Sequence, residues 1–114
     1  MCSKKVLDEI SQKIYLSARD VLGNKLEKVY LFGSYARGDY DEESDIDFFV
    51  LADIPPEDAT KTRWKIRSLM GDVDLEYDVV TCIHMASSSL FHKFRDVMPY
   101  YTNVIKDGKE LAYA

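Results

Sequence analysis

Apolar residues recur through the first part of the chain at the spacing of an α-helix. Five of them lie three or four residues apart and would share one helical face, namely Val6, Ile10, Ile14, Ala18 and Val21. Gly23-Asn24 follows as a helix stop signal. The pattern predicts an amphipathic helix that ends near residue 22.

Two later segments change to the period of a β-strand. Side chains alternate from Leu26 to Gly33 and again from Asp45 to Ala52, and Pro55-Pro56 ends the second strand. Alternate residues of a strand point to opposite faces, so one face of the second strand carries Ile46, Phe48 and Val50 and the other Asp45, Asp47, Phe49 and Leu51. The spacing from Glu57 to Met70 then predicts a helix whose inward residues are Ala59, Ile66, Leu69 and Met70.

Acidic and apolar residues alternate from Asp74 to Met85, which predicts a third strand. Asp74, Glu76 and Asp78 would share one face with the later residues Cys82 and His84. Serines at 87–89, Pro99 and Gly108 bound two further short helical segments. The expected fold is α/β (α+β), a small mixed sheet of about three to five strands with helices packed on one face.

The two aspartates at the start of the second strand are the strongest candidates for chemistry. Asp45 and Asp47 would hold their carboxylates side by side, and adjacent carboxylates repel unless a cation neutralises them. Hard oxygen ligands in this arrangement suit Mg²⁺, which phosphate groups of a substrate commonly complete. Gly33-Ser34, directly after the first strand, would let backbone N–H groups approach such a phosphate closely.

These residues together resemble a known family. Gly33-Ser34, ten intervening residues and the tetrad Ser44-Asp45-Ile46-Asp47 are similar to the motif of the DNA polymerase beta nucleotidyltransferase superfamily. The chain most closely resembles its smallest members, the minimal nucleotidyltransferases, and Ala36-Arg37-Gly38 also fits their pattern.

The resemblance implies a reaction and a set of site residues. A hydroxyl would attack the α-phosphate of a nucleoside triphosphate, and Asp45 and Asp47 would hold two Mg²⁺ ions, with Mn²⁺ as a substitute. Asp78 is the preferred third carboxylate, which would complete the metal nearest the acceptor, and Glu76 is its competitor. Gly33-Ser34 would bind the outgoing phosphates, and Arg37 would either neutralise triphosphate charge or fix the acidic loop.

Composition limits the remaining choices. A chain of 114 residues with 46% hydrophobic content can bury one core, so residues 1–114 are expected to form a single nucleotidyltransferase domain. A net charge of −5 argues against binding to free nucleic acid. Cys2 and Cys82 form no disulfide framework, no apolar stretch reaches membrane-spanning length, and a cytoplasmic location is expected. His84 and His92 lack metal-ligand spacing and are expected to be structural.

The biological role is also implied by the resemblance. Minimal nucleotidyltransferases often accompany HEPN-domain toxins, which they silence by adenylylation or by binding. The expected role is therefore that of an antitoxin that uses a nucleoside triphosphate, with ATP preferred. Modification of an aminoglycoside-like small molecule and non-catalytic binding are the alternatives. Sequence leaves the acceptor, the base of the triphosphate and the oligomeric state open.

Overall fold

The N-terminal helix, α1 (Lys4–Leu22), is the one that the apolar spacing predicts. Ser3 caps its start, because the side-chain oxygen of Ser3 accepts a hydrogen bond of 3.2 Å from the Val6 backbone N–H. Gly23 ends it at a φ of 58°, a left-handed value that glycine adopts without a Cβ penalty. Its apolar face is fully buried at Ile10, Ile14 and Ala18.

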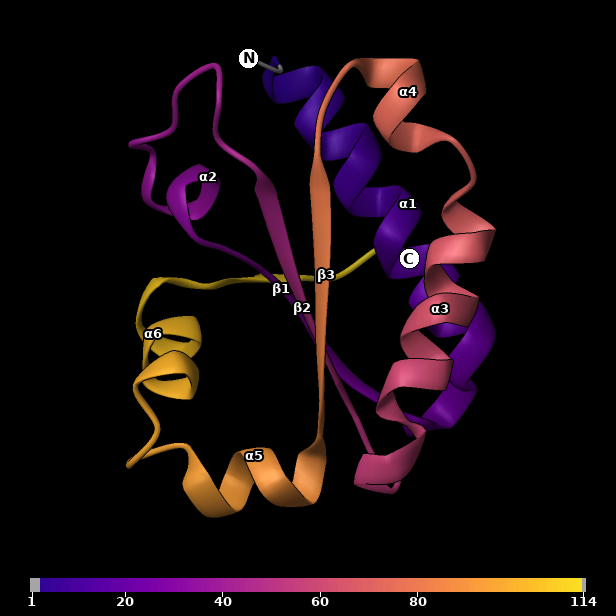
Figure 1. Cartoon of the computed structure of the whole chain (residues 1–114), viewed down its shortest axis with the longest axis vertical. Helices are drawn as coiled ribbons and strands as arrows, with labels where there is room; N and C mark the ends of the chain where they lie inside the picture. Colours follow the sequence, from indigo (N-terminus) through magenta and orange to yellow (C-terminus); the bar gives the residue numbers. More distant parts are fainter. Residues whose placement is uncertain (1–2, 114) are drawn as a thin grey trace.

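A mixed sheet crosses the middle of the computed structural model, which describes residues 3–113 (Figure 1). Within those residues the sheet has four strands in the order β3-β2-β1-β4. β1 pairs antiparallel with both β2 and β4, whereas β2 and β3 run parallel. The strands are β1 (Leu26–Phe32), β2 (Ile46–Ala52), β3 (Thr81–Ser87) and β4 (Lys109–Leu111).

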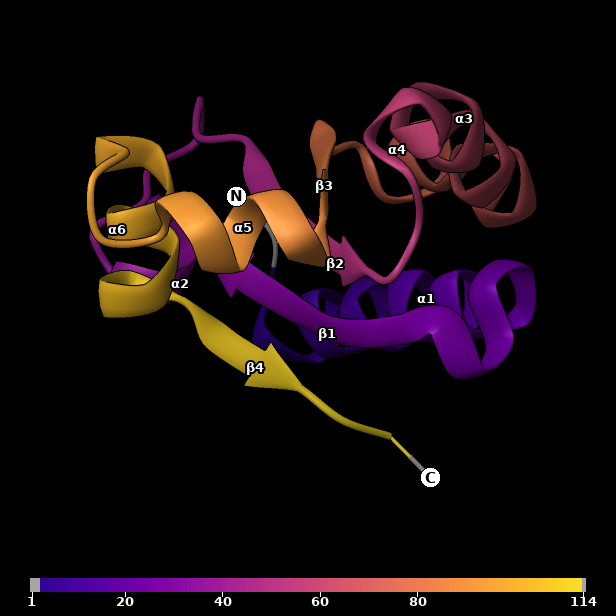
Figure 2. The ribbon, with the colours of Figure 1, turned by 90° about the horizontal axis from the view of Figure 1, so that it is seen from below.

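Helices cover the two faces of the sheet unequally (Figure 2). α1 and α3 (Ala59–Met70) pack on one face and enclose the larger core. On the other face, α5 (Ser88–Phe94) and α6 (Pro99–Asp107) enclose a smaller cluster around Phe49. The predicted α/β sheet with a helical layer is confirmed, and the structure adds this second layer. The remaining helical segments are η1 (Gly23–Lys25), α2 (Ser34–Arg37), η2 (Pro56–Asp58) and α4 (Val73–Tyr77).

The third strand begins later than the alternation predicts. Its expected first half is instead the short helix α4, and β3 starts only at Thr81. Val73 and Tyr77, four residues apart, both pack on the larger core, which is the contact pattern of a helix. Leu75, one of the apolar residues of that alternation, is 83% exposed. Leu69 on α3 was expected to face inward, and this is wrong, because 49% of it is exposed. The alternation was compatible with either structure, and burial of Val73 favours the helix.

Two further expectations concern membrane-spanning segments and the cysteines. No helix among residues 3–113 combines the length and the apolar composition needed to cross a membrane. Cys82 is a free, half-buried thiol, and Cys2 lies outside the described residues.

Candidate active site

The two aspartates predicted to carry the chemistry lie where β2 begins. Asp45 immediately precedes the strand and is exposed, and Asp47 is its second residue, with 27% of its side chain exposed. Partial burial raises the pKa of Asp47, and the negative charge of Asp45 raises it further, against the lowering effect of His84. The site therefore holds two acidic groups that destabilise each other until a cation is supplied.

Gly33 forms the other side of this site, at the end of β1. Its φ of 74° and ψ of −155° lie in a region that is essentially restricted to glycine. From there the chain makes one helical turn, α2, in which the backbone N–H groups of Ala36 and Arg37 both donate to the Gly33 carbonyl. A Cβ at Gly33 would lie 2.5 Å from Asp47 Oδ2, so a glycine is what allows the turn to approach the carboxylate.

β3 contributes two side chains that face the aspartates. The parallel register sets Asp47 beside Cys82 and Phe49 beside His84. His84 Nε2 lies 3.5 Å from Asp47 Oδ1, and the Cys82 thiol donates a weak hydrogen bond of 3.8 Å to Asp45 Oδ2. Burial raises the pKa of Cys82, and the nearby negative aspartates raise it further, so the thiol stays protonated.

His84 is the residue that the sequence interpretation missed. It was expected to be structural because it lacks a metal-ligand spacing. The sequence did contain a signal, because side chains alternate along a strand and this alternation puts His84 on the same face of the third strand as the candidate carboxylates. Cys82 and His84 do share that face in the structure, although the strand starts later than expected.

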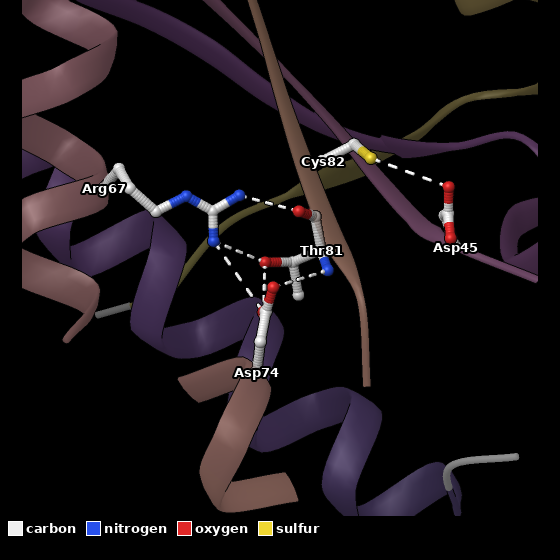
Figure 3. A network of polar contacts seen from close by, with 5 residues as sticks. All are labelled: Asp45, Arg67, Asp74, Thr81 and Cys82. Atoms are coloured by element: carbon white, nitrogen blue, oxygen red, sulfur yellow. Dashed lines mark hydrogen bonds and ion pairs between the residues drawn. The ribbon is translucent and has the colours of Figure 1, made fainter. Parts of the chain in front are cut away.

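A polar network fixes the start of β3 beside the site (Figure 3). Arg67 of α3 donates from Nη1 to Thr81 Oγ1 at 2.7 Å and from Nη2 to the Thr81 carbonyl at 2.6 Å. Asp74 of α4 accepts from the Thr81 hydroxyl at 2.6 Å and from its backbone N–H at 3.2 Å. Arg67 and Asp74 also form an ion pair of 3.7 Å. Cys82, the next residue, is thereby held against Asp45.

The candidate third carboxylates do not lie on β3. Glu76 is an exposed residue of α4, and Asp78 ends that helix in a left-handed conformation, with a φ of 54°. Asp78 nevertheless lines a cleft of about 420 Å³ that Asp45 also borders, whereas Glu76 is not among the residues lining it. The expected placement on the strand is wrong, and position now favours Asp78 over Glu76 for a different reason.

Arg37 holds the acidic loop that joins α2 to β2. Its Nε donates to Asp39 Oδ2 at 3.2 Å, and its Nη1 lies 3.9 Å from Asp107 Oδ2 at the end of α6. Of the two roles considered for Arg37, these contacts match fixation of the loop. The same positive charge lowers the pKa of Asp47, so Arg37 also acts on the site electrostatically.

The donor set suits a hard divalent cation. Among residues 3–113 no group of three or more His, Cys, Asp and Glu side chains could by itself hold a metal ion. Two neighbouring carboxylates fit Mg²⁺, which is usually bound by one or two carboxylates, water and substrate phosphates. Because Gly33 has no side chain, only its backbone lies next to the Asp47 carboxylate.

A sequence model of the nucleotidyltransferase domain matches residues 4–109, nearly the whole chain. The chain belongs to the nucleotidyltransferase domain family. Two relatives are inferred protein adenylyltransferases of Methanocaldococcus jannaschii. MJ0141 is 36% identical over 93 residues, covering 82% of this chain and 92% of the relative. MJ0604 is 36% identical over 87 residues, covering 76% of this chain and 79% of the relative.

Two solved structures that contain a toxin-antitoxin resemble this nucleotidyltransferase. A chain in a crystal structure of a toxin-antitoxin with AMP-PNP superposes with a TM-score of 0.58 at 29% identity, covering 91% of this chain and 73% of that chain. A chain in a mutant of the toxin-antitoxin MntA-HpeT gives a TM-score of 0.58 at 27% identity over the same shares. The resemblance to the minimal nucleotidyltransferases is confirmed.

Proposed function

We propose that this nucleotidyltransferase transfers AMP from ATP, with Mg²⁺, to a hydroxyl group of a partner protein. The observation that carries the proposal is the approach of the Gly33 turn to Asp47, with Asp45 adjacent. The names of the two adenylyltransferase relatives support a protein acceptor and adenylyl transfer. The AMP-PNP complex of the structural neighbour supports an adenine nucleotide as the donor.

The residues of the site have separate tasks in this proposal. Asp45 and Asp47 would bind Mg²⁺, two ions in the preferred scheme, and Mn²⁺ could replace it. The bound metal supplies charge neutralisation at the phosphates. Gly33 and Ser34 bind the outgoing pyrophosphate through backbone N–H groups and the Ser34 hydroxyl. His84 orients the Asp47 carboxylate through the 3.5 Å contact with Oδ1.

Asp78 is proposed as the third carboxylate of the site. It lines the same cleft as Asp45, so it can contribute an oxygen or a hydrogen-bonded water from the edge of that cleft. Arg37 remains a proposed contact to the triphosphate. It would act from its present position between Asp39 and Asp107, where it adds positive charge near Asp47.

The proposed partner is a HEPN-domain toxin, which this protein would silence in the cytoplasm as an antitoxin. The toxin-antitoxin structures among the neighbours support this role. The acidic balance of the chain, with a net charge of −5, makes free nucleic acid a poor acceptor and leaves the recognition of the acceptor to contacts between proteins.

The test is transfer of label from α-³²P-ATP to the product of a neighbouring HEPN-type gene. Wild-type protein with Mg²⁺ should label the partner, whereas Asp45→Asn and Asp47→Asn should not. Asp53→Asn is the matched control, because Asp53 is an exposed aspartate just beyond the far end of β2. It should label the partner as fast as the wild type.

Two outcomes would contradict the proposal. Absence of label on a correctly folded partner that does bind the protein would exclude adenylyl transfer to it. Neutralisation of the toxin by Asp45→Asn and Asp47→Asn as well as by wild type would favour a non-catalytic antitoxin.

A further inference from the structure

A groove of about 370 Å³ runs along the free edge of β3, the outer strand of the sheet. It is lined by β3, by the beginning of α3 and by residues around the start of α6. In Figure 1 β3 lies between α3 and α6. The wall on the α6 side is formed by Met98, Tyr100 and Tyr101, and the wall on the α3 side includes Thr60 and Arg63. His84 is part of the floor. Apart from the contact of His84 with Asp47, the proposed function assigns nothing to this groove.

The groove is continuous with the site through His84. Asp47 has two differently placed oxygens, since Oδ2 faces the Gly33 turn at the end of β1 and Oδ1 lies 3.5 Å from His84 Nε2 on β3. Tyr100 stacks edge-on or tilted against both Phe32 and His84, with ring centroids 5.9 and 5.8 Å apart. A group that lies in the groove beside His84 is therefore next to the catalytic carboxylate.

The order of the strands indicates whether the group in the β3 groove is the acceptor or the nucleotide. Nucleotidyl transfer is an in-line displacement, in which the attacking oxygen and the leaving pyrophosphate lie on opposite sides of the α-phosphorus. The proposed pyrophosphate site is at the end of β1, the carboxylates lie where β2 begins, and the groove lies beyond them on β3. A hydroxyl that attacks opposite to the β1 side must come from the β3 side.

The charge of the lining residues distinguishes this groove from the cleft beside Asp45. The cleft beside Asp45 is lined by four carboxylates, those of Glu42, Glu43, Asp45 and Asp78. None of the residues that line the β3 groove is acidic, and Arg63 contributes a positive charge. The lining combines the Met98 thioether and two tyrosine rings with polar groups such as Arg63 and His84. This mixture favours a protein segment that carries both an apolar part and a polar group such as a hydroxyl.

We propose that the β3 groove is the acceptor site, in which the Met98 and Arg63 walls position the hydroxyl-bearing segment of the partner protein against His84 and Asp47. The inference rests on the proposed adenylyl transfer and specifies where the acceptor enters. It departs from the expectation that Asp78 completes the metal nearest the acceptor, because Asp78 lines the separate cleft beside Asp45. In the reaction, the acceptor oxygen forms a bond to the α-phosphorus. The bond between the α-phosphorus and the oxygen that bridges it to the β-phosphate breaks, and pyrophosphate and a proton leave.

The experiment compares two neighbouring exposed residues in the labelling assay with saturating ATP. Met98, 42% exposed, borders the groove, and Val97, 72% exposed, does not. Met98→Glu should raise the KM for the partner at least 10-fold and Val97→Glu less than twofold. The dissociation constant of AMP-PNP, measured by calorimetry, should change less than twofold in both. If Met98→Glu does not fold, the same comparison can be made on the opposite wall, with Arg63→Ala as the test and Lys65→Ala as its control.

The outcomes separate the two proposals. If wild type labels the partner but Met98→Glu and Val97→Glu behave alike, as do the two α3 variants, the groove is not the acceptor site. If Met98→Glu weakens AMP-PNP more than the partner, the groove holds the nucleotide and the inference is overturned. If wild type does not label the partner, adenylyl transfer fails and the acceptor assignment fails with it.

Discussion

Replacement of Gly33 by alanine tests the geometry on which the active site depends. The backbone at Gly33, with φ 74° and ψ −155°, costs a residue with a side chain about 1–3 kcal/mol. In a domain of this size that corresponds to a fall in Tm of about 3–6 °C for each kcal/mol. The new Cβ would also lie 2.5 Å from Asp47 Oδ2, and the carboxylate would have to withdraw by about 1 Å to reach an ordinary contact of 3.4 Å.

Activity should fall much more than stability does. The clashing atom is the end of a flexible side chain, so Asp47 can rotate away at little energetic cost, but a misplacement of about 1 Å in a catalytic group lowers the rate about 100-fold. Gly38→Ala is the matched control, because Gly38 also has a positive φ of 85° but nothing lies within 4 Å of its Cβ position. It should lose about 1 kcal/mol and keep its activity.

Chemical denaturation and the ATP labelling assay measure the two effects on the same preparations. Equal loss of activity in Gly33→Ala and Gly38→Ala would mean that strain in the connecting loop, and not displacement of Asp47, controls the site. Full activity in Gly33→Ala would refute the proposed role of the turn.

Three further predictions concern neighbouring groups. Because burial raises the pKa of Asp47 above its unfolded value, the stability of the wild type in EDTA should fall as the pH rises through the raised pKa of the folded state. Asp47→Asn should remove this pH dependence and add about 0.5–2 kcal/mol of stability at neutral pH. Added Mg²⁺ should raise the Tm of the wild type only. Arg67→Ala should lose about 1–3 kcal/mol in urea denaturation and much of the activity, because it removes two hydrogen bonds to the buried Thr81 and the ion pair with Asp74, whereas Lys65→Ala should change neither. Asp78→Asn should slow transfer at least 10-fold while Glu76→Gln does not, and the reverse result would exchange the two residues.

The elements that were predictable from the sequence are those with one dominant period. The spacing of Ile10, Ile14 and Ala18 fits a helix, and the short apolar run of β2, which ends before Asp53 and the prolines, fits a buried strand, so α1 and the position of Asp47 follow from local pattern. The same pattern also places Gly33 directly after β1. The paired aspartates beside the glycine turn could therefore be found without coordinates.

The rest depends on contacts between distant segments. The alternation around Leu75 suits both a strand and a short helix, and only packing of Val73 and Tyr77 against α1 and its neighbours favours the helix. His84 acquires a functional position only when β3 pairs in parallel with β2, which no local motif reports. The groove beside it also requires α3 and α6, which are separated in the chain, to meet at β3.

The Arg67 and Asp74 contacts to Thr81 have a consequence for the alignment of β3. A slip of this edge strand by one position would reverse every side chain, so that Ile83 or Met85, depending on the direction of the slip, would replace His84 beside Asp47 and the imidazole would point to the opposite face of the sheet. Two charged side chains outside the proposed catalytic centre thus hold the alignment that brings His84 to Asp47.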